Sequence, residues 1–238
     1  QVQVHDQPVE EARAGQRVAL AIHGISREEV GRGDWLATPG RYRPSHLLDV
    51  RLELLDSAPR AVGSRARLRF HLGASELMGR AVLLDGDTLA PGQECWAQLR
   101  LEKPAVASAG DRLVIRSYSP ATTIAGATVV DPTPPKRAHA GGEDRARLET
   151  LRSGTALEKI AALTAEAGRA GLGVDEAAVR LGLPAASIAE AASAAAAAAL
   201  AVDPAAKLVR LMVVADLEME GLDPKKYGLE GTPKGIKP

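Results

Sequence analysis

A block of short apolar alternations, residues 45–131, constrains the fold of this chain more than any other feature. Turn residues interrupt it every eight to twelve positions, a spacing typical of all-β barrels. Its clearest segment alternates strictly between apolar and charged residues: Leu48, Val50, Leu52 and Leu54 against Asp49, Arg51 and Glu53. Further strands are predicted at 66–72, 77–84, 94–101, 112–116 and 127–130. Six short strands predict a compact antiparallel barrel.

Before this block the chain reads as part of a second β structure. Residues 1–5 and 18–22 are predicted strands, and 7–14 are a polar connection between them. Two strands leave open sheet edges, so we expect their partners to lie upstream of Gln1 and the chain to be a fragment. A glycine- and proline-punctuated connector then leads to the barrel, with an apolar edge expected at Trp35 and Leu36.

After the barrel the periodicity becomes helical. Residues 133–142, TPPKRAHAGG, have a linker composition. Helices are predicted at 144–151, 156–167, 174–181 and 185–201, with one apolar stripe of Leu157, Ile160, Ala161 and Leu163. The last two helices flank a Gly-Leu-Pro turn, which is the helix-turn-helix pattern. Residues 207–214 can supply the strand of a wing, and we expect 215–238 to be disordered.

Composition limits the function. The formal net charge is zero and only six residues are aromatic, so neither a global field nor a base-stacking platform draws the chain to nucleic acid. One cysteine, Cys95, excludes an intrachain disulfide and fits a reducing cytoplasm. No apolar run is long enough to span a bilayer, and no signal peptide is visible. The histidines show no metal-ligand spacing, so no metal site is predicted.

Four segments carry a family resemblance: VQVHDQPVEEARAGQRVAL, RGDWL, RFHLGASELMGRAVLLD and GDRLVIRSYSPATTIAGATVVDPTPPK. They resemble the bacterial selenocysteine-specific translation elongation factors, which are GTPases related to elongation factor Tu. The resemblance is strong over residues 1–137 and weaker over 143–210. It implies a fold that is mainly β plus α: a partial β-barrel, a complete antiparallel β-barrel of elongation factor type, and an α-rich winged-helix domain.

The same resemblance implies domain boundaries. Residues 1–43 would end the second barrel domain, 44–132 would form the third, 133–142 would be a linker, 143–214 the first winged-helix domain and 215–238 a disordered tail. The expected partners are selenocysteinyl-tRNA and the ribosome, with an mRNA hairpin bound only by later winged-helix modules. We expect a cytoplasmic monomer.

No G-x-x-x-x-G-K-[ST] phosphate loop occurs in the sequence. We therefore predict that this chain is not itself an enzyme and holds no cofactor. GTP and Mg²⁺ would bind the GTPase domain of the parent protein.

The resemblance also indicates candidate site residues. Arg17 matches the family arginine that lines the aminoacyl pocket for selenocysteine, although a surface arginine paired with Glu10 or Glu11 is the simpler interpretation. Candidate contacts to the tRNA backbone are Arg67, Arg69, His71, Arg116 and Tyr118. For these residues a solvated strand face and a capped turn are the structural alternatives.

The sequence leaves two other functions open. One is the accessory region of another elongation factor Tu-like GTPase. The other is a winged-helix DNA-binding regulator, but residues 185–201 contain no Lys, Arg, Asn or Gln to contact bases.

Overall fold

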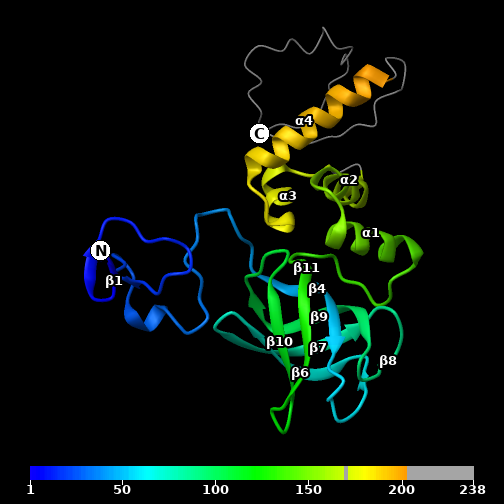
Figure 1. Cartoon of the computed structure of the whole chain (residues 1–238), viewed down its shortest axis with the longest axis horizontal. Coiled ribbons are helices and arrows are strands. Elements are labelled where there is room, and N and C mark those ends of the chain that lie inside the picture. The colour runs from blue at the N-terminus through cyan, green and yellow to red at the C-terminus, as the bar shows by residue number, and fades with distance from the viewer. Residues whose placement is uncertain (169–170, 203–238) are drawn as a thin grey trace, which may run out of the picture.

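The computed structural model describes residues 1–168 and 171–202. Figure 1 shows three parts: the N-terminal lobe (residues 1–44), the barrel (residues 45–131) and the helical unit (residues 142–202). The lobe lies beside the barrel, and the helices lie across one end of it.

The barrel is closed by six antiparallel strands in the order β10-β11-β4-β9-β7-β6. These strands are β4 (Ser45–Leu54), β6 (Ala66–Leu72), β7 (Ser75–Leu83), β9 (Glu94–Ala105), β10 (Arg112–Ser117) and β11 (Thr123–Asp131). A short pair, β5 (Val62–Gly63) and β8 (Thr88–Leu89), lies outside this ring. The predicted complete antiparallel barrel is confirmed, with one strand for each alternating segment.

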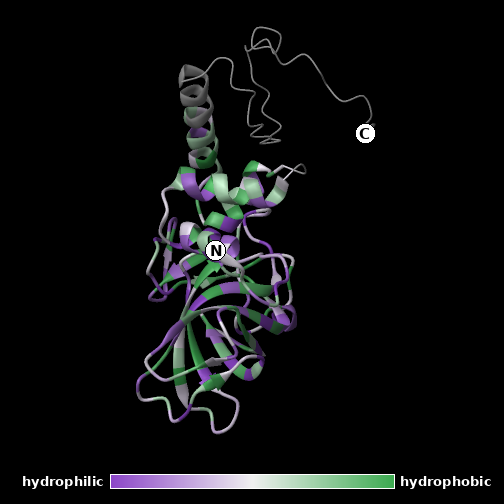
Figure 2. Ribbon diagram, turned by 90° about the vertical axis from the view of Figure 1, so that its right-hand side faces the viewer, coloured by the Kyte–Doolittle hydropathy of each residue, from purple (hydrophilic) through white to green (hydrophobic). Residues whose placement is uncertain are grey.

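Alternation along each strand builds the barrel core. Hydrophobic and hydrophilic residues alternate along the strands in Figure 2, and the largest fully buried side chains inside the barrel include Phe70, Leu48, Leu52, Leu54, Leu99 and Ile115. Burying one such side chain stabilises the fold by roughly 1.5–3 kcal/mol. Cys95 belongs to this core, and burial raises the pKa of its thiol to about 12.

The N-terminal lobe is a three-stranded sheet in the order β2-β1-β3: β1 (Val2–Val4), β2 (Gln7–Val9) and β3 (Ala19–Leu20). The prediction of a polar connection at 7–14 is wrong at its start, because Gln7–Val9 pairs with β1. His5 and Asp6 make the turn with φ of 50° and 61°, the positive values that tight hairpins require. The predicted strand 18–22 shortens to two paired residues, and Leu20 remains 47% exposed.

The connector is the part of the N-terminal lobe between β3 and β4. It contains a short 3-10 helix, η1 (Arg27–Glu29), and then attaches to the barrel near the β6–β7 turn. Ser75 Oγ donates to the carbonyl of Gly33 at 3.0 Å, and Arg32 Nε donates to the carbonyl of Ala74 at 3.1 Å. Trp35 does not start a strand. Its ring meets Tyr42 edge-on with centroids 5.5 Å apart, so an aromatic contact replaces the predicted apolar edge.

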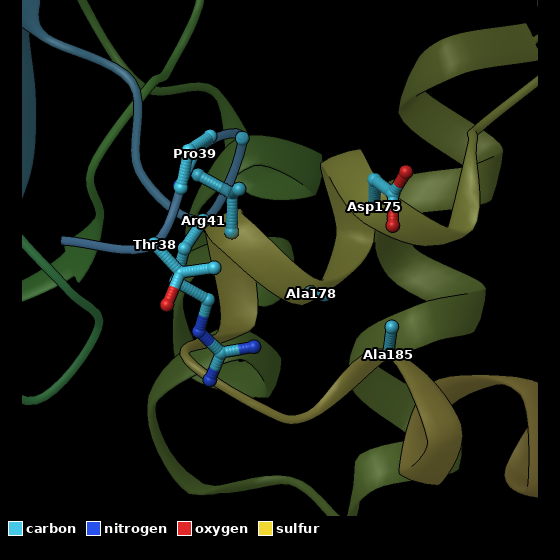
Figure 3. Close-up of a pocket in the computed structure, with 8 residues that line it drawn as sticks. Thr38, Pro39, Arg41, Asp175, Ala178 and Ala185 are labelled. Atoms are coloured by element: carbon cyan, nitrogen blue, oxygen red, sulfur yellow. The ribbon is translucent and has the colours of Figure 1, made fainter.

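The connector also reaches the helical unit. Arg41 Nη1 donates to the carbonyl of Leu183 at 3.2 Å. A hollow of about 210 Å³ lies beside this contact, lined by residues 38–41 and by Asp175, Ala178, Val179 and Ala185 (Figure 3). Arg41 and Leu183, which are 142 positions apart in the sequence, thus hold the connector against the turn after α3.

The helical unit consists of α1 (Gly142–Ser153), α2 (Ala156–Ala167), α3 (Val174–Leu181) and α4 (Ala185–Val202). Thr155 caps α2, because its Oγ1 accepts a hydrogen bond from the backbone amide of Glu158 at 3.3 Å. Of the predicted stripe on α2, Ile160 and Leu163 are buried, but Leu157 and Ala161 are exposed, so the prediction is wrong for these two positions. None of the described helices has the length and apolar character needed to cross a membrane. The predicted wing at 207–214 and the tail at 215–238 lie outside the described residues.

The helices share a hydrophobic core with the outer surface of the barrel. That core joins Val82, Trp96 and Val130 of the strands, and Leu84 just after β7, to Leu148, Leu151, Ile160, Leu163 and Ile188 of the helices. Trp96 therefore contacts the helical unit, while its neighbour Cys95 points into the barrel.

A buried ionic cluster crosses the same boundary. Its members are Asp49 (β4), Asp131 (β11), Arg137 (linker), Arg147 (α1), Glu166 (α2) and Arg180 (α3). Arg137 Nη1 lies 2.7 Å from Asp49 Oδ2, and Arg180 Nη2 lies 2.6 Å from Glu166 Oε2. Gln98 of β9 donates to Asp49 Oδ1 at 2.8 Å and to the carbonyl of Pro135 at 2.9 Å. These contacts hold the linker residues against the barrel.

A close approach of β7 to β9 generates a first prediction. A Cβ at Gly79 would lie 2.4 Å from the carbonyl oxygen of Arg100, which is backbone and cannot move aside. We expect Gly79→Ala to lower the free energy of unfolding by about 1–3 kcal/mol. Gly86→Ala is the matched control, because a Cβ there meets nothing within 4 Å. Urea unfolding would measure both, and equal stabilities of the two variants would contradict the close approach.

The ionic cluster generates a second prediction. Burial raises the pKa of Asp49 to about 7, and the hydrogen bond from Gln98 and the charge of Arg137 offset only part of this. Between about pH 4 and pH 7, Asp49 is therefore protonated in the folded state and ionised in the unfolded state. The free energy of unfolding consequently falls as pH rises through this range. We expect wild type, measured relative to Asp49→Asn, to lose about 1.4 kcal/mol per pH unit between pH 5 and 7. If the difference in unfolding free energy between wild type and Asp49→Asn stays constant or grows with pH, Arg137 keeps Asp49 ionised throughout this range.

Candidate nucleic-acid interface

The candidate tRNA-contacting residues lie on two neighbouring strands. Arg116 of β10 is the register partner of Arg69 of β6. Because side chains alternate along a strand, Leu68, Phe70 and Leu72 fill the barrel while Arg67, Arg69 and His71 point outwards. Closure of the barrel thus brings residues nearly 50 positions apart onto one outer surface.

Tyr118 lies at the centre of this surface. The guanidinium carbon of Arg67 is 4.8 Å from the Tyr118 ring centroid, and that of Arg69 is 5.6 Å away. Arg69 Nε also donates to the Tyr118 carbonyl at 3.2 Å. Tyr118 remains 47% exposed, so part of its surface is available to a partner. We call Arg67, Arg69, Arg116 and Tyr118 the Tyr118 face.

Two carboxylates position the arginines of this face. Glu102 accepts from Arg67 Nε at 2.8 Å and from Nη2 at 3.1 Å, and Glu76 accepts from Arg69 Nη1 at 2.6 Å. The hydrogen bond from Arg69 lowers the pKa of Glu76, and the hydrogen bond to Glu102 raises the pKa of Arg67. Both pairs are exposed, and each guanidinium keeps N–H groups for another acceptor. Exposed pairs of this kind contribute little stability, but they restrict the side-chain rotamers.

A hollow of about 430 Å³ adjoins the Tyr118 face. Its polar lining consists of Arg60, Arg67, Ser117, Tyr118 and Ser119, with apolar residues such as Val62 and Ile124 behind them. Guanidinium and hydroxyl groups are the side chains that most often contact nucleic-acid phosphates. Arg60 belongs to a loop without periodicity, so no sequence signal indicated its place beside Tyr118.

His71 lies at the margin of this surface. Its register partner on β7 is Glu76, and it is two positions from Arg69 along β6. His71 Nε2 is buried and has no hydrogen-bond partner among the described residues. The structure therefore places His71 near the face but not against Tyr118.

Arg17 belongs to a different site. It lines a hollow of about 360 Å³ in the N-terminal lobe together with Gln3, His5, Asp6, Val18 and Ala19. The simpler interpretation, pairing with Glu10 or Glu11, is not observed among the described residues; Glu11 instead lies 3.8 Å from Arg13. In the described part of the chain no carboxylate lies within 4.0 Å of the Arg17 guanidinium.

Known proteins resemble this chain in sequence. Residues 49–136 match the family model "Selenocysteine-specific elongation factor, beta-barrel domain". The selenocysteine-specific elongation factor of Desulfomicrobium baculatum is 38% identical over 176 residues, covering 74% of this chain and 27% of that protein. The Escherichia coli (strain K12) protein of the same name is 38% identical over 133 residues, covering 56% of this chain and 20% of that protein.

A solved structure supports the fold. The crystal structure of a bacterial selenocysteine-specific elongation factor matches 76% of this chain and 28% of its own, with a TM-score of 0.58 and 23% identity. The chain thus spans about a quarter of the length of these relatives. The resemblance found in the sequence is confirmed: residues 49–136 of this chain are similar to the β-barrel domain of the selenocysteine-specific elongation factors.

Proposed function

We propose that this chain is the tRNA-binding portion of a translation factor that delivers selenocysteinyl-tRNA to the ribosome at recoded UGA codons. The observation that supports this most is the Tyr118 face, where Arg67 and Arg69 lie over one exposed aromatic ring and Arg116 is the register partner of Arg69. The face combines forked cation donors with a stacking surface, and both suit an RNA backbone.

The neutral net charge makes the local arrangement decisive. Without a global field, affinity for RNA depends on the few arginines that can reach phosphates. Glu76 and Glu102 hold Arg69 and Arg67 in place, which lowers the conformational entropy lost on binding. Arg116 has only Thr123 Oγ1, at 3.3 Å, as its side-chain partner among the described residues, so its charge is free for a phosphate.

The remaining partners follow from the family. GTP and Mg²⁺ would bind the GTPase domain of the whole protein, and an mRNA hairpin would bind later winged-helix modules. In this proposal the boundaries are those predicted above, the helical unit is the first winged-helix domain, and the protein works as a cytoplasmic monomer. A DNA-binding regulator is disfavoured, because the exposed side chains of α4 between residues 185 and 194 are Ala186, Ser187, Glu190, Ser193 and Ala194.

The Tyr118 face generates a third prediction. We expect Arg116→Ala to weaken binding of an in vitro transcribed selenocysteine tRNA and to reduce the slope of log K against log[KCl] by about one. Fluorescence anisotropy at several salt concentrations would measure both quantities. Arg152→Ala is the control, since Arg152 is exposed on α1 and pairs with Glu149. If Arg116→Ala keeps the wild-type slope of log K against log[KCl], the Tyr118 face does not contact the RNA.

The N-terminal hollow generates a fourth prediction. A selenol ionises more readily than a hydroxyl, so a guanidinium at Arg17 would favour selenocysteine over serine. Charged hydrogen bonds contribute roughly 1.5–3 kcal/mol, which corresponds to about ten- to more than a hundredfold in affinity. We expect Arg17→Ala in the whole elongation factor to lose this preference between selenocysteinyl- and seryl-tRNA. Arg13→Ala, in the same lobe, should keep it. A preference that survives in the Arg17 variant would show that Arg17 is only a surface charge.

A further inference from the structure

A row of arginines crosses the outer surface of the barrel next to the Tyr118 face. Arg67 of β6 is the register partner of Arg80 of β7, and Arg80 is the register partner of Arg100 of β9. Register partners point to the same side of a sheet, and neighbouring strands are about 4.8 Å apart. The row therefore spans three strands, or about 10 Å.

Most of this row is not neutralised. Arg67 is paired with Glu102, but in the described part of the chain no carboxylate lies within 4.0 Å of Arg80, Arg100 or their neighbour Arg65. Arg80 Nη1 donates instead to the carbonyl of Arg65 at 2.9 Å, and Arg100 Nη2 donates to the carbonyl of Arg137 at 2.6 Å. Like charges directly opposite one another destabilise a sheet. An anion bound across the row would relieve that repulsion.

Two details show that these arginines are held in unfavourable states. Arg65 has a φ of 66°, in the left-handed region that residues with a Cβ seldom adopt. Arg100 Nε is buried and has no hydrogen-bond partner among the described residues. Such costs gather at binding sites more often than elsewhere.

We propose that Arg65, Arg80 and Arg100, the Arg80 flank, bind phosphates of the same RNA that lies on the Tyr118 face. This inference rests on the proposed function and extends it. Arg67 of the Tyr118 face is the register partner of Arg80, so an RNA strand that crosses the Tyr118 ring can continue over Arg80 without leaving the barrel. Guanidinium groups suit phosphate oxygens because their N–H donors match that geometry in pairs. The far end of the flank lies at the linker, where Arg100 contacts Arg137.

The flank can be tested without disturbing the Tyr118 face. Arg65→Gly removes a charge and places glycine at a positive φ that suits it, so the fold should be preserved. Arg80→Ala removes the central charge, and Arg80→Lys restores it. The probe is unacylated, in vitro transcribed selenocysteine tRNA, titrated against the full chain by fluorescence anisotropy at several KCl concentrations. Thermal melting of each variant checks that it is folded.

We expect Arg65→Gly and Arg80→Ala each to reduce the salt slope by about one and to weaken binding about five- to tenfold at 0.1 M KCl. Arg80→Lys should recover most of the slope, and Arg152→Ala should bind as wild type. If Arg116→Ala lowers the salt slope but neither Arg65→Gly nor Arg80→Ala does, the flank is not an RNA surface and the proposed function stands. If Arg116→Ala, Arg65→Gly and Arg80→Ala all keep the wild-type slope, the proposed function fails together with the flank. If the flank variants lose binding only to polyglutamate, added as a second probe, an acidic protein fits this surface and the RNA proposal is overturned.

Discussion

The arrangement of this chain depends on charges buried between the barrel and the helices. Asp49 and Asp131 come from β4 and β11, Glu166, Arg147 and Arg180 from the helices, and Arg137 from the linker. Taking such groups out of water costs several kcal/mol for each ion, and the cost is offset only when every charge has a partner nearby. Each member is therefore needed by the others. Once Asp49 is ionised, above about pH 7, three carboxylates balance three guanidinium groups, and removing one member would leave an uncompensated charge in the interior.

Arg147 and Arg180 illustrate two ways in which the cluster holds a cation. None of the three guanidinium nitrogens of Arg147 has a hydrogen-bond partner among the described residues, although Glu166 lies 3.3 Å away. Burial accordingly lowers the pKa of Arg147. Burial acts on Arg180 in the same direction, but hydrogen bonds and charge from Asp131 and Glu166 outweigh it and raise its pKa. The guanidinium of Arg180 therefore binds α3 firmly to the strands.

This attachment makes the helical unit an extension of the barrel. The cluster and the shared hydrophobic core around Trp96 and Val130 act on the same boundary, and Arg41 adds a contact from the connector. Arg67, Arg80 and Tyr118 of the RNA surfaces proposed above are exposed, at positions that these contacts do not cover. One end of their arginine row meets the linker at Arg137, which is also a member of the ionic cluster. RNA bound along the row would therefore end beside the joint between barrel and helices.

The sequence alone determined the barrel, because period-two alternation is a local property that places Leu48, Phe70 and Leu99 on inward faces whatever their partners are. The four helices followed from their own periodicity and turn residues in the same way. Strand pairing and helix docking are long-range, so the Arg116–Arg69 register, the place of Arg60 beside Tyr118 and the Arg67–Arg80–Arg100 row were decided only by closure of the barrel. The ionic cluster was invisible for a related reason. Asp49 sits in its strand as an ordinary outward-facing charged residue, and only the docked helices convert that exposed position into a buried one.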